Sequence, residues 1–280
     1  MNILITGSKG MLGHALTAKL SEEHRVSGLD LPDLDITDLN GLRKAMFSYR
    51  PDLIINTAAY TDVDGCETNT EMAFAVNATG PRNLAAACRE LNISLVHFST
   101  DYIFDGTADI PYKEVDNPNP LSVYGKSKLK GENYIREITD KHYIIRTSWL
   151  YGPHGKNFVA AMLRLAGEQD EIGVVNDQTG SPTYTFDLAA AVLKLISVKE
   201  YGIYHITNSG TCTWYEFSLE IFKQAGINGI SVKPTTTEEL NRPAPRPKYS
   251  VLDNEKWHSG GNPRLRNYKD ALNEYMQSFT

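Results

Sequence analysis

A tyrosine and a lysine four residues apart could act together in proton transfer. Tyr124 and Lys128 stand in the segment YGKSK, and residues 129–138 after it have a helical pattern. Two side chains four residues apart lie on the same face of a helix. A tyrosine ordinarily titrates near ~10, and a fixed cation beside it lowers the pKa of the phenol. The pair is therefore a candidate proton donor, although YxxxK alone also fits a surface lysine beside a half-buried tyrosine.

The hydroxyl of Thr100 is a second candidate group. It follows an apolar run at residues 94–98, which is typical of a buried strand. In a parallel sheet the carboxyl ends of the strands face the ligand crevice. Residues 56–59, Asn-Thr-Ala-Ala, end the preceding strand with small side chains that leave room for a cofactor. We expect Thr100 and the Tyr–Lys pair to meet at one edge of the sheet.

Three glycines form a candidate phosphate-binding turn. Gly7, Gly10 and Gly13 come directly after a first apolar strand and directly before a helical stretch that begins near Met11. Glycine permits the tight strand-to-helix turn and lets backbone N–H groups approach a pyrophosphate, whose charge the helix N-terminus favours. At the first strand of an alternating α/β chain, this placement predicts a dinucleotide-binding site.

Two charged residues bear on the choice of dinucleotide. Asp30 ends the second predicted strand, where an acidic residue about 20 positions beyond the glycines ordinarily binds the adenosine ribose of NAD(H). Lys9 lies inside the glycine turn and could meet the 2′-phosphate of NADP(H), or remain a solvated loop lysine. The sequence therefore leaves both dinucleotides open.

These groups need a scaffold, and the first half of the chain alternates short apolar runs with helical segments. The pattern is typical of βαβ units and of a parallel sheet covered by helices on both faces. A helix is predicted over residues 76–91, because its apolar residues recur at intervals of three or four. The predicted strands are residues 2–6, 25–29, 53–56, 94–98 and 143–146.

After about Ser148 the alternation loosens. Helices are predicted at residues 158–168 and 186–196, while the prolines between residues 234 and 250 forbid a long helix. We predict an α/β fold, in which a Rossmann-type, doubly wound parallel sheet is joined to a smaller C-terminal α/β substrate-binding domain. The predicted dinucleotide-binding domain takes residues 1–148 and about 176–198, and the substrate-binding domain takes about 149–175 and 199–280.

The composition is that of an ordinary soluble globular protein. Among 280 residues, 28 Lys and Arg against 34 Asp and Glu give a net charge of −6, which argues against a nucleic-acid partner. No apolar stretch reaches the ~20 residues of a transmembrane helix, and no secretory leader precedes the first strand. We therefore expect a cytoplasmic protein without a membrane partner. The three cysteines are widely spaced, which fits buried free thiols rather than disulfides or a metal site.

The motifs together carry a family resemblance. A glycine turn, a strand-end hydroxyl and a YxxxK pair, in that order, resemble the short-chain dehydrogenase/reductase superfamily, in its extended branch that acts on nucleotide sugars. The resemblance sharpens to the dTDP-4-dehydrorhamnose reductase family, whose motifs STDYxFDG, YGKxKxxGE and RTSWxYG all occur here. The similar segments are residues 1–13, 56–67, 97–106, 120–132, 146–152, 175–183 and 246–253.

The resemblance implies reduction of the 4-keto group of dTDP-4-dehydro-L-rhamnose to dTDP-L-rhamnose, the last step in the synthesis of that nucleotide sugar. The cofactor implied is NADP(H), with NAD(H) as the alternative. The family's triad falls on Thr100, Tyr124 and Lys128. Tyr124 would protonate the 4-oxygen, Thr100 would hydrogen-bond to the same oxygen, and Lys128 would bind the nicotinamide ribose and lower the pKa of the tyrosine.

The same resemblance assigns binding residues. Trp149 would lie against the sugar ring, with a core indole as the alternative, and Asp101 would contact the sugar hydroxyls. Cofactor contacts are expected at Gly7, Ser8, Lys9, Gly10, Met11, Leu12, Gly13, Asp30, Asp35, Ile36, Ala58, Ala59, Tyr60, Asn77, Tyr124 and Lys128. Substrate contacts are expected at Thr61, Val63, Asp101, Tyr102, Trp149, Asn157, Gln178 and Arg246.

The chain departs from the family at a metal site. Some members form a dimer around Mg²⁺ held by glutamates, one of them in the first helix, where this chain has Ala15 beside His14. Asp187 could match a second ligand, but one carboxylate is not a metal site. We therefore expect no metal, and either a monomer or a metal-independent homodimer that binds a nucleotide sugar.

Two other functions remain open. An epimerase or a 4,6-dehydratase would share the superfamily motifs, although a dehydratase would have a glutamate where this chain has Tyr102. A non-catalytic regulatory subunit, like the β subunit of methionine adenosyltransferase, would share the fold. The presence of Thr100, Tyr124 and Lys128 favours an enzyme.

Overall fold

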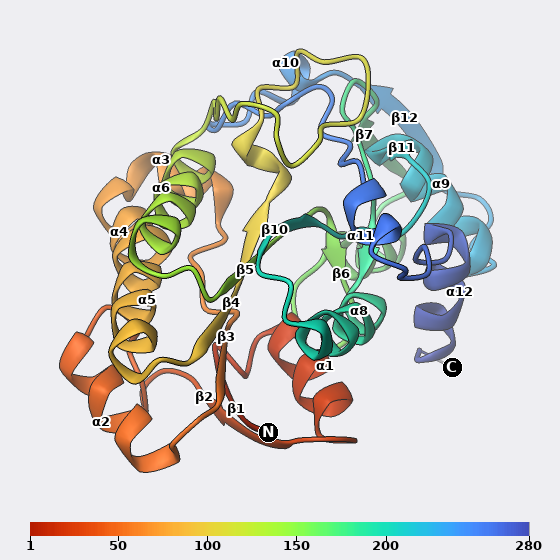
Figure 1. Cartoon of the computed structure of the whole chain (residues 1–280). Helices are drawn as coiled ribbons and strands as arrows, with labels where there is room; N and C mark the ends of the chain where they lie inside the picture. The colour runs from red at the N-terminus through yellow and green to blue at the C-terminus, as the bar shows by residue number, and fades with distance from the viewer. Residues whose placement is uncertain (280) are drawn as a thin grey trace.

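The computed structural model describes residues 1–279, and its centre is one six-stranded sheet. The strands run parallel in the order β10-β5-β4-β3-β1-β2, as Figure 1 shows. They are β1 (Asn2–Thr6), β2 (Arg25–Leu29), β3 (Leu53–Asn56), β4 (Ser94–Thr100), β5 (His142–Thr147) and β10 (Gly202–His205). The predicted parallel sheet is confirmed, and β4 and β5 are longer than the runs predicted at residues 94–98 and 143–146.

Helices cover both faces of this sheet, so the doubly wound α/β prediction is also confirmed (Figure 1). On one face α1 (Met11–Leu20) packs against α8 (Thr185–Val198). On the other face lie α2 (Leu39–Tyr49), α5 (Gly80–Leu91) and α6 (Val123–Ile138). Successive strand residues point to opposite faces, so Ile3 and Ile5 join the core under α1 while Leu4 joins the core under α5.

The helix predicted over residues 76–91 is present with a change of pitch near its start. Residues Ala75–Thr79 form a π-helical segment, and α5 continues from Gly80. Two short helices, α3 (Val63–Thr68) and α4 (Thr70–Phe74), precede it. A 3-10 turn, Asp101–Ile103, directly follows β4. These segments lie at the carboxyl ends of β3 and β4, where the candidate site was expected.

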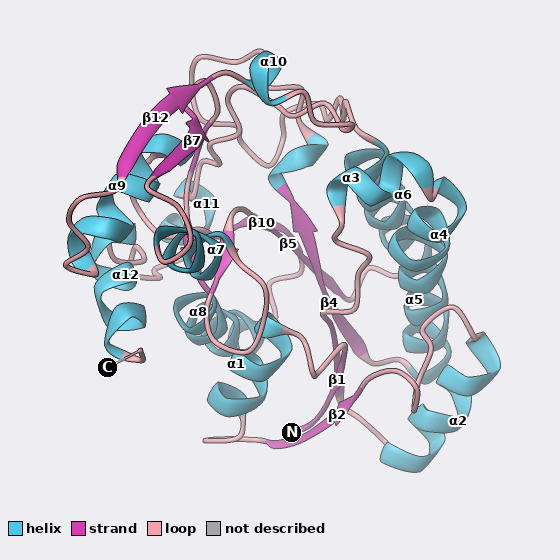
Figure 2. Ribbon diagram, turned by 180° about the vertical axis from the view of Figure 1, so that it is seen from behind, coloured by secondary structure: helices cyan, strands magenta, loops and turns pink. Residues whose placement is uncertain are grey.

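A second group of elements lies to the left in Figure 2. Its helices α7 (Phe158–Ala166), α9 (Trp214–Gln224) and α12 (Tyr268–Gln277) share a largely aromatic core. Around them, β7 (Glu171–Val175) pairs with β12 (Ser231–Thr235), β6 (Leu150–Tyr151) with β9 (Thr183–Tyr184), and β8 (Thr179–Gly180) with β11 (Cys212–Thr213). The short helix α10 (Thr237–Leu240) follows β12, whereas α11 (Glu255–Ser259) packs against β10 and places Trp257 in the core of the six-stranded sheet.

The chain crosses between the two groups more than once. α8 and β10 return to the sheet, and β10 adds its edge strand beyond the return predicted at about 176–198. The division into two domains with the boundaries given above stays a prediction.

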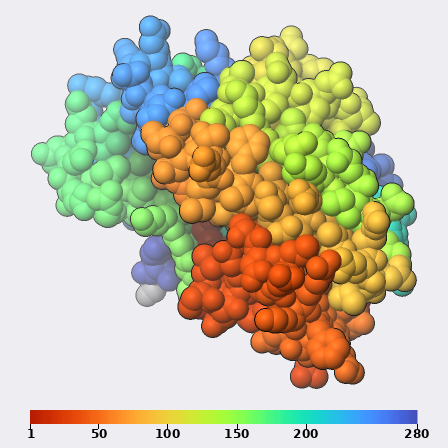
Figure 3. All heavy atoms as spheres, turned by 90° about the vertical axis from the view of Figure 1, so that its left-hand side faces the viewer, coloured from red at the N-terminus to blue at the C-terminus, as the bar shows by residue number. Residues whose placement is uncertain are grey.

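Residues 234–250 contain no long helix, as their prolines predict, but they are not irregular throughout: β12 ends at Thr235, the four-residue helix α10 follows, and residues 242–248 are irregular. Arg242 and Arg246 form ion pairs with Asp64 of α3, and the backbone N–H of Ala244 donates to the same carboxylate. In Figure 3 the blue surface of this part of the chain lies against the orange surface that includes α3. The segment therefore joins the second group of elements to the cofactor side of the fold.

Within residues 1–279, no helix combines the length and the apolar character that crossing a bilayer requires. Cys66, Cys88 and Cys212 are buried and unpaired. The prediction of free thiols is confirmed.

Candidate active site

The glycine turn brings three backbone segments into close contact. Gly7 has φ 72°, and a Cβ there would lie 2.5 Å from the backbone nitrogen of Ala58. A Cβ on Gly13 would lie 2.5 Å from the carbonyl oxygen of Gly7. No side chain caps α1 at Gly10, so the first N–H groups of the helix remain free to bind a ligand. The cradle fits a pyrophosphate.

Two cavities meet beside this turn. One, of about 490 Å³, runs from the glycine turn to Tyr124 and Lys128. The other, of about 270 Å³, runs from the glycine turn to Asp30 and Asp35. They share Gly10, Thr57, Ala58 and Ala59. A dinucleotide has two such halves, and these cavities would take the nicotinamide and adenosine halves respectively.

An acidic and a basic side chain lie near each other here: Asp30 lines the smaller cavity, and Lys9 lines the larger one. Asp30 accepts a hydrogen bond from the backbone N–H of Lys9, at 2.9 Å. The Lys9 ammonium donates to the carbonyl of Leu31 at 3.3 Å and lies 3.9 Å from Asp33. The carboxylate suits a ribose hydroxyl and the exposed ammonium suits a 2′-phosphate, so the geometry is compatible with both dinucleotides.

Helix α6 places Lys128 in the interior. Ser122 caps the helix by accepting from the N–H of Gly125 at 3.1 Å. Lys128 is 3% exposed, and its ammonium donates to the carbonyl oxygen of Phe98 at 2.5 Å. Burial lowers the pKa of Lys128 to about 8, against an opposing effect of Glu132. The lysine therefore remains a cation at neutral pH.

Tyr124 lies on the same helix, and its half-buried side chain lines the larger cavity. Burial raises the pKa of Tyr124 above its ordinary value, although contact with the Thr100 hydroxyl opposes the rise. The effect of Lys128 on the pKa of Tyr124 stays a prediction, because the rise in pKa comes first from desolvation of the phenolate. The phenol consequently holds its proton at neutral pH, which suits a proton donor.

The strand end beside Tyr124 carries a buried hydrogen-bonded pair. Thr100 donates to Asp101 at 2.9 Å and accepts from the N–H of Tyr102 at 3.2 Å. Asp101 is 2% exposed and accepts a second bond from Ser250 at 2.6 Å. Burial raises the pKa of Asp101 to about 6. The acid therefore fixes the orientation of the Thr100 hydroxyl.

Trp149 stands in an aromatic stack. Its ring lies parallel to that of Trp214, with centroids 3.5 Å apart and planes 7° apart, and Phe158 packs on the other tryptophan. The backbone of Trp149 has φ 48°, and Gly180 leaves no room for a Cβ beside the indole. The ring is half-buried, so one part of it remains available to a ligand.

Three further predicted substrate residues have hydrogen-bond partners within the protein. Arg246 forms a two-pronged pair with Asp64, at 3.0 and 2.9 Å. Asn157 caps α7 by accepting from Ala160 at 2.9 Å, and its amide donates to the carbonyl of Gly152. Gln178 is 4% exposed and donates to Thr237. These contacts hold the loops of the second group of elements in place.

The structure gathers most of the predicted cofactor residues around the two cavities. Those that line a cavity are Gly7, Lys9, Gly10, Met11, Leu12, Gly13, Asp30, Asp35, Ile36, Ala58, Ala59, Tyr124 and Lys128. Ser8, Tyr60 and Asn77 do not, and Asn77 instead bonds to the backbone of Tyr60 and to Ser127. Of the predicted substrate residues, only Thr61 lines one of these two cavities. The others lie outside both: Val63, Asp101, Tyr102, Trp149, Asn157, Gln178 and Arg246. The catalytic candidate Thr100 also lies outside both.

Sequence reasoning missed several residues of the larger cavity. Ser99, Thr147, His154 and Lys156 all line it. His154 lies 4.5 Å from His14 of α1, ring centre to ring centre. The segment GPHGK, directly after the RTSWLY motif, was noted only as a break in the alternation. The glycines and the two basic residues of this segment were the available signal for a loop that lines a phosphate-binding site.

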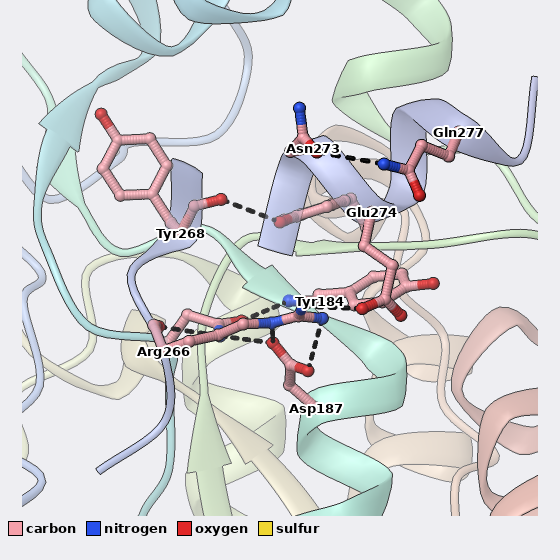
Figure 4. A network of polar contacts seen from close by, with 9 residues as sticks. Tyr184, Asp187, Arg266, Tyr268, Asn273, Glu274 and Gln277 are labelled. Carbon is pink, nitrogen blue, oxygen red and sulfur yellow. Dashed lines mark hydrogen bonds and ion pairs between the residues drawn. The ribbon is translucent and has the colours of Figure 1, made fainter. Parts of the chain in front are cut away.

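The residues around Asp187 do not fit Mg²⁺. Figure 4 shows Arg266 facing Asp187, and the two-pronged pair has distances of 2.9 and 2.9 Å. Asn208 donates to the same carboxylate at 2.7 Å. Ala15 is buried in the apolar core, and residues 1–279 contain no group of three or more side chains that could hold a metal. Because a guanidinium already neutralises the carboxylate, the expectation of no Mg²⁺ stays a prediction that this geometry favours.

Comparison with known proteins gives one consistent group of relatives. The model of the RmlD substrate binding domain family matches residues 1–280. A dTDP-4-dehydrorhamnose reductase of Streptomyces griseus is 44% identical, over 97% of this chain and 91% of its own.

Solved structures agree with the sequence relatives. A dTDP-4-dehydrorhamnose reductase of Clostridium acetobutylicum has a TM-score of 0.97 at 46% identity, over 100% of this chain and 99% of its own. A dTDP-4-dehydrorhamnose reductase of Bacillus anthracis, solved in complex with NADP, has a TM-score of 0.96 at 41% identity, over 99% of this chain and 98% of its own.

Proposed function

The chain belongs to the RmlD substrate binding domain family, which includes dTDP-4-dehydrorhamnose reductases, and from that premise we propose its reaction. It is an NADP(H)-dependent oxidoreductase that reduces the 4-keto group of dTDP-4-dehydro-L-rhamnose to give dTDP-L-rhamnose. The observation that carries this proposal is the 490 Å³ cavity, which joins a glycine turn fit for pyrophosphate to Tyr124 and Lys128.

The two connected cavities would hold the dinucleotide. The N–H groups that follow Gly10 would bind the pyrophosphate, while Asp30 and Lys9 would face the adenosine ribose and its 2′-phosphate. Ala58 and Ala59 leave the space between the halves open. When bound, NADPH supplies the hydride for the carbonyl carbon.

Tyr124 would deliver the proton. Its phenol keeps the proton at neutral pH because burial raises the pKa of the side chain. As negative charge develops on the 4-oxygen of the sugar, the O–H of Tyr124 donates to that oxygen and then transfers its proton. Thr100 would donate to the same oxygen after its O–H, which donates to Asp101 in this structure, turns toward the substrate.

Lys128 would act on the tyrosine and on the ribose. After the transfer, the phenolate of Tyr124 lies on the same helix face as the ammonium of Lys128, one turn away. The cation stabilises the phenolate until solvent restores its proton. Its three N–H donors allow one bond to the carbonyl of Phe98 and others to the nicotinamide ribose.

The nucleotide-sugar contacts are proposed for Thr61, Val63, Asp101, Tyr102, Trp149, Asn157, Gln178 and Arg246. Arg246 is the residue among them with the charge for a diphosphate, and it would bind one while keeping part of its contact with Asp64. For the assembly we propose a monomer or a metal-independent homodimer.

A direct assay tests the reaction. The protein is incubated with dTDP-4-dehydro-L-rhamnose and NADPH, and oxidation of the nicotinamide is followed together with formation of dTDP-L-rhamnose. Parallel runs with NADH measure the cofactor preference. Stoichiometric consumption supports the proposal, whereas an epimerase or dehydratase gives no net consumption and a regulatory subunit leaves every nucleotide sugar unchanged.

A further inference from the structure

A buried ion pair lies directly behind the catalytic helix. Glu132 of α6 is 0% exposed, and Arg146 of β5 is 2% exposed. The guanidinium donates to the carboxylate from Nη2 at 2.8 Å and from Nε at 3.1 and 3.3 Å. Its Nη1 donates to the carbonyl of Glu114 at 3.4 Å and faces Nε2 of His205 at 3.3 Å. Every nitrogen of Arg146 thus has a partner.

His205 takes part in this network as a neutral ring. Its Nδ1 lies 3.0 Å from the carbonyl oxygen of Tyr112, which can only accept, so Nδ1 carries the proton and Nε2 accepts from Arg146. Burial and the neighbouring Arg146 lower the pKa of His205 to about 3. The charges at the centre of the network are therefore the cation of Arg146 and the anion of Glu132.

Glu132 lies one helical turn beyond Lys128, on the same buried face of α6. Lys128 is bonded to Phe98 of β4, and Glu132 is bonded to Arg146 of β5. Arg146 is the register partner of Ser99, the residue directly after Phe98. The two side chains therefore fasten one helix to two neighbouring strands at the same level of the sheet.

Among the groups around Lys128, Glu132 is the anion that favours the ammonium form of the lysine. From β4, His97 faces it as a neutral imidazole, because burial and then the cation itself lower the pKa of that histidine. From α6, Tyr124 is a protonated phenol. From β5, Arg146 pairs with Glu132. Glu132 is the charged group that raises the pKa of Lys128 against the effect of burial.

We propose that Glu132, clamped by Arg146, is a positioning residue of the reductase that keeps Lys128 in its ammonium form and in register with Tyr124. The inference rests on the proposed reductase function. Stability alone does not account for the pair, since replacing a buried ion pair by apolar residues of similar volume is often neutral or stabilising.

The test measures the alkaline limb of the pH profile of kcat/KM, that is, the pH range over which activity falls as the pH rises. We expect the wild-type protein to lose kcat/KM for the keto sugar as Lys128 loses its proton. In the double variant Glu132→Gln/Arg146→Met, which leaves no unpaired charge in the network, we expect this limb to move toward lower pH by about 1 unit or more. Glu132→Asp keeps the charge, and its limb should stay with the wild type. The affinity for NADPH, measured by fluorescence titration over the same pH range, should show the same displacement without any turnover.

Glu114→Gln is the matched control, because Glu114 accepts from the backbone of His205 in the same network but does not contact Arg146 through its carboxylate. The alkaline limb of the Glu114→Gln variant should lie at the same pH as that of the wild type. A folded double variant with an unmoved limb, or a double variant that fails to fold, would assign the pair to the scaffold and overturn the proposal. A wild-type protein that binds NADPH but reduces no dTDP-4-keto sugar would instead overturn the proposed function, while the NADPH titration would still test Glu132.

Discussion

Replacing Lys128 by methionine should make the protein inactive and more stable at neutral pH. The side chain is 3% exposed, and a bond to the carbonyl of Phe98 is its hydrogen bond within the described residues. A buried ammonium is disfavoured relative to the same group in the unfolded chain, which water surrounds. Methionine has a similar length and carries no charge. The substitution therefore removes a destabilising burial together with a group required for the reaction.

The size of the gain follows from the titration of the lysine. Burial lowers the pKa of Lys128 from 10.5 to about 8, and one pKa unit corresponds to about 1.4 kcal/mol. At pH 7 the charge thus costs about 3 kcal/mol of folding free energy. The carbonyl of Phe98 loses its donor in the variant, which takes back about 1–2 kcal/mol. We expect the free energy of unfolding to rise by about 1–2 kcal/mol, which is a few degrees in Tm.

The gain should depend on pH in a defined direction. Below pH 8 the lysine is protonated in both the folded and the unfolded wild type, so the full cost applies. Between about 8 and 10.5 the unfolded chain binds the proton more strongly than the folded protein, and the stability of the wild type rises with pH. The advantage of the variant should therefore shrink across this window and reverse above it, where only the lost bond to Phe98 remains.

Urea unfolding of the cofactor-free proteins at pH 7 and pH 9.5 measures the difference. Lys126→Met is the matched control, because Lys126 is exposed on the same helix, and its stability should equal that of the wild type at both pH values. A Lys128→Met protein that is less stable than wild type at pH 7 would refute the reasoning. So would a gain that is equally large at both pH values.

Three further outcomes are expected. Tyr124→Phe should bind NADPH as the wild type does but lower kcat by roughly 10²–10⁴-fold, because the proton donor is lost; near-normal turnover would remove Tyr124 from this role. Trp149→Ala should raise KM for the nucleotide sugar more than it changes KM for NADPH, and unchanged kinetics would make the ring a core residue only. Dialysis against EDTA should leave the rate and the elution volume in gel filtration unchanged, since Arg266 already neutralises Asp187; loss of activity that Mg²⁺ restores would contradict this.

The sheet was predictable because its strands are marked by local signals. β1, β2 and β3 begin and end at the predicted residues, where runs of apolar side chains stop at glycine, aspartate or asparagine. The glycine turn and the Tyr–Lys pair were predictable for a similar reason: each is a short segment whose residue types and spacing determine its own geometry. For these parts of the site, the residues that act together are close in the sequence as well as in space.

The partners of single charged residues could not be predicted in this way. Arg246 pairs with Asp64, which is 182 residues away in the sequence, and Asp187 pairs with Arg266 at a separation of 79. Nothing local distinguishes these arginines from solvated ones. His154 and Lys156 were missed because their position over the glycine turn depends on how the second group of elements packs against α1.

The sign of the pKa change at Tyr124 was also beyond the sequence. Helical spacing places a cation one turn away and favours the phenolate, but it contains no information on burial. In the folded protein the phenol is desolvated, and this raises its pKa. Spacing identified the participants, whereas their protonation depends on the depth at which the sheet and the 3-10 turn at Asp101–Ile103 enclose them.

The burial that surrounds Tyr124 also makes the charge of Lys128 costly, and this connects the ion pair behind the helix to the chemistry. Enclosure excludes water from the reacting atoms, and the same enclosure lowers the pKa of the lysine toward the working pH. An anion within one helical turn of Lys128 opposes that decrease, but an unpaired buried carboxylate would itself become protonated. Arg146 contacts Glu132 in a two-pronged pair, so the anion beside Lys128 has a cationic partner of its own. If this is the reason for the pair, removing its charges must change the pH at which the enzyme works and not merely the rate.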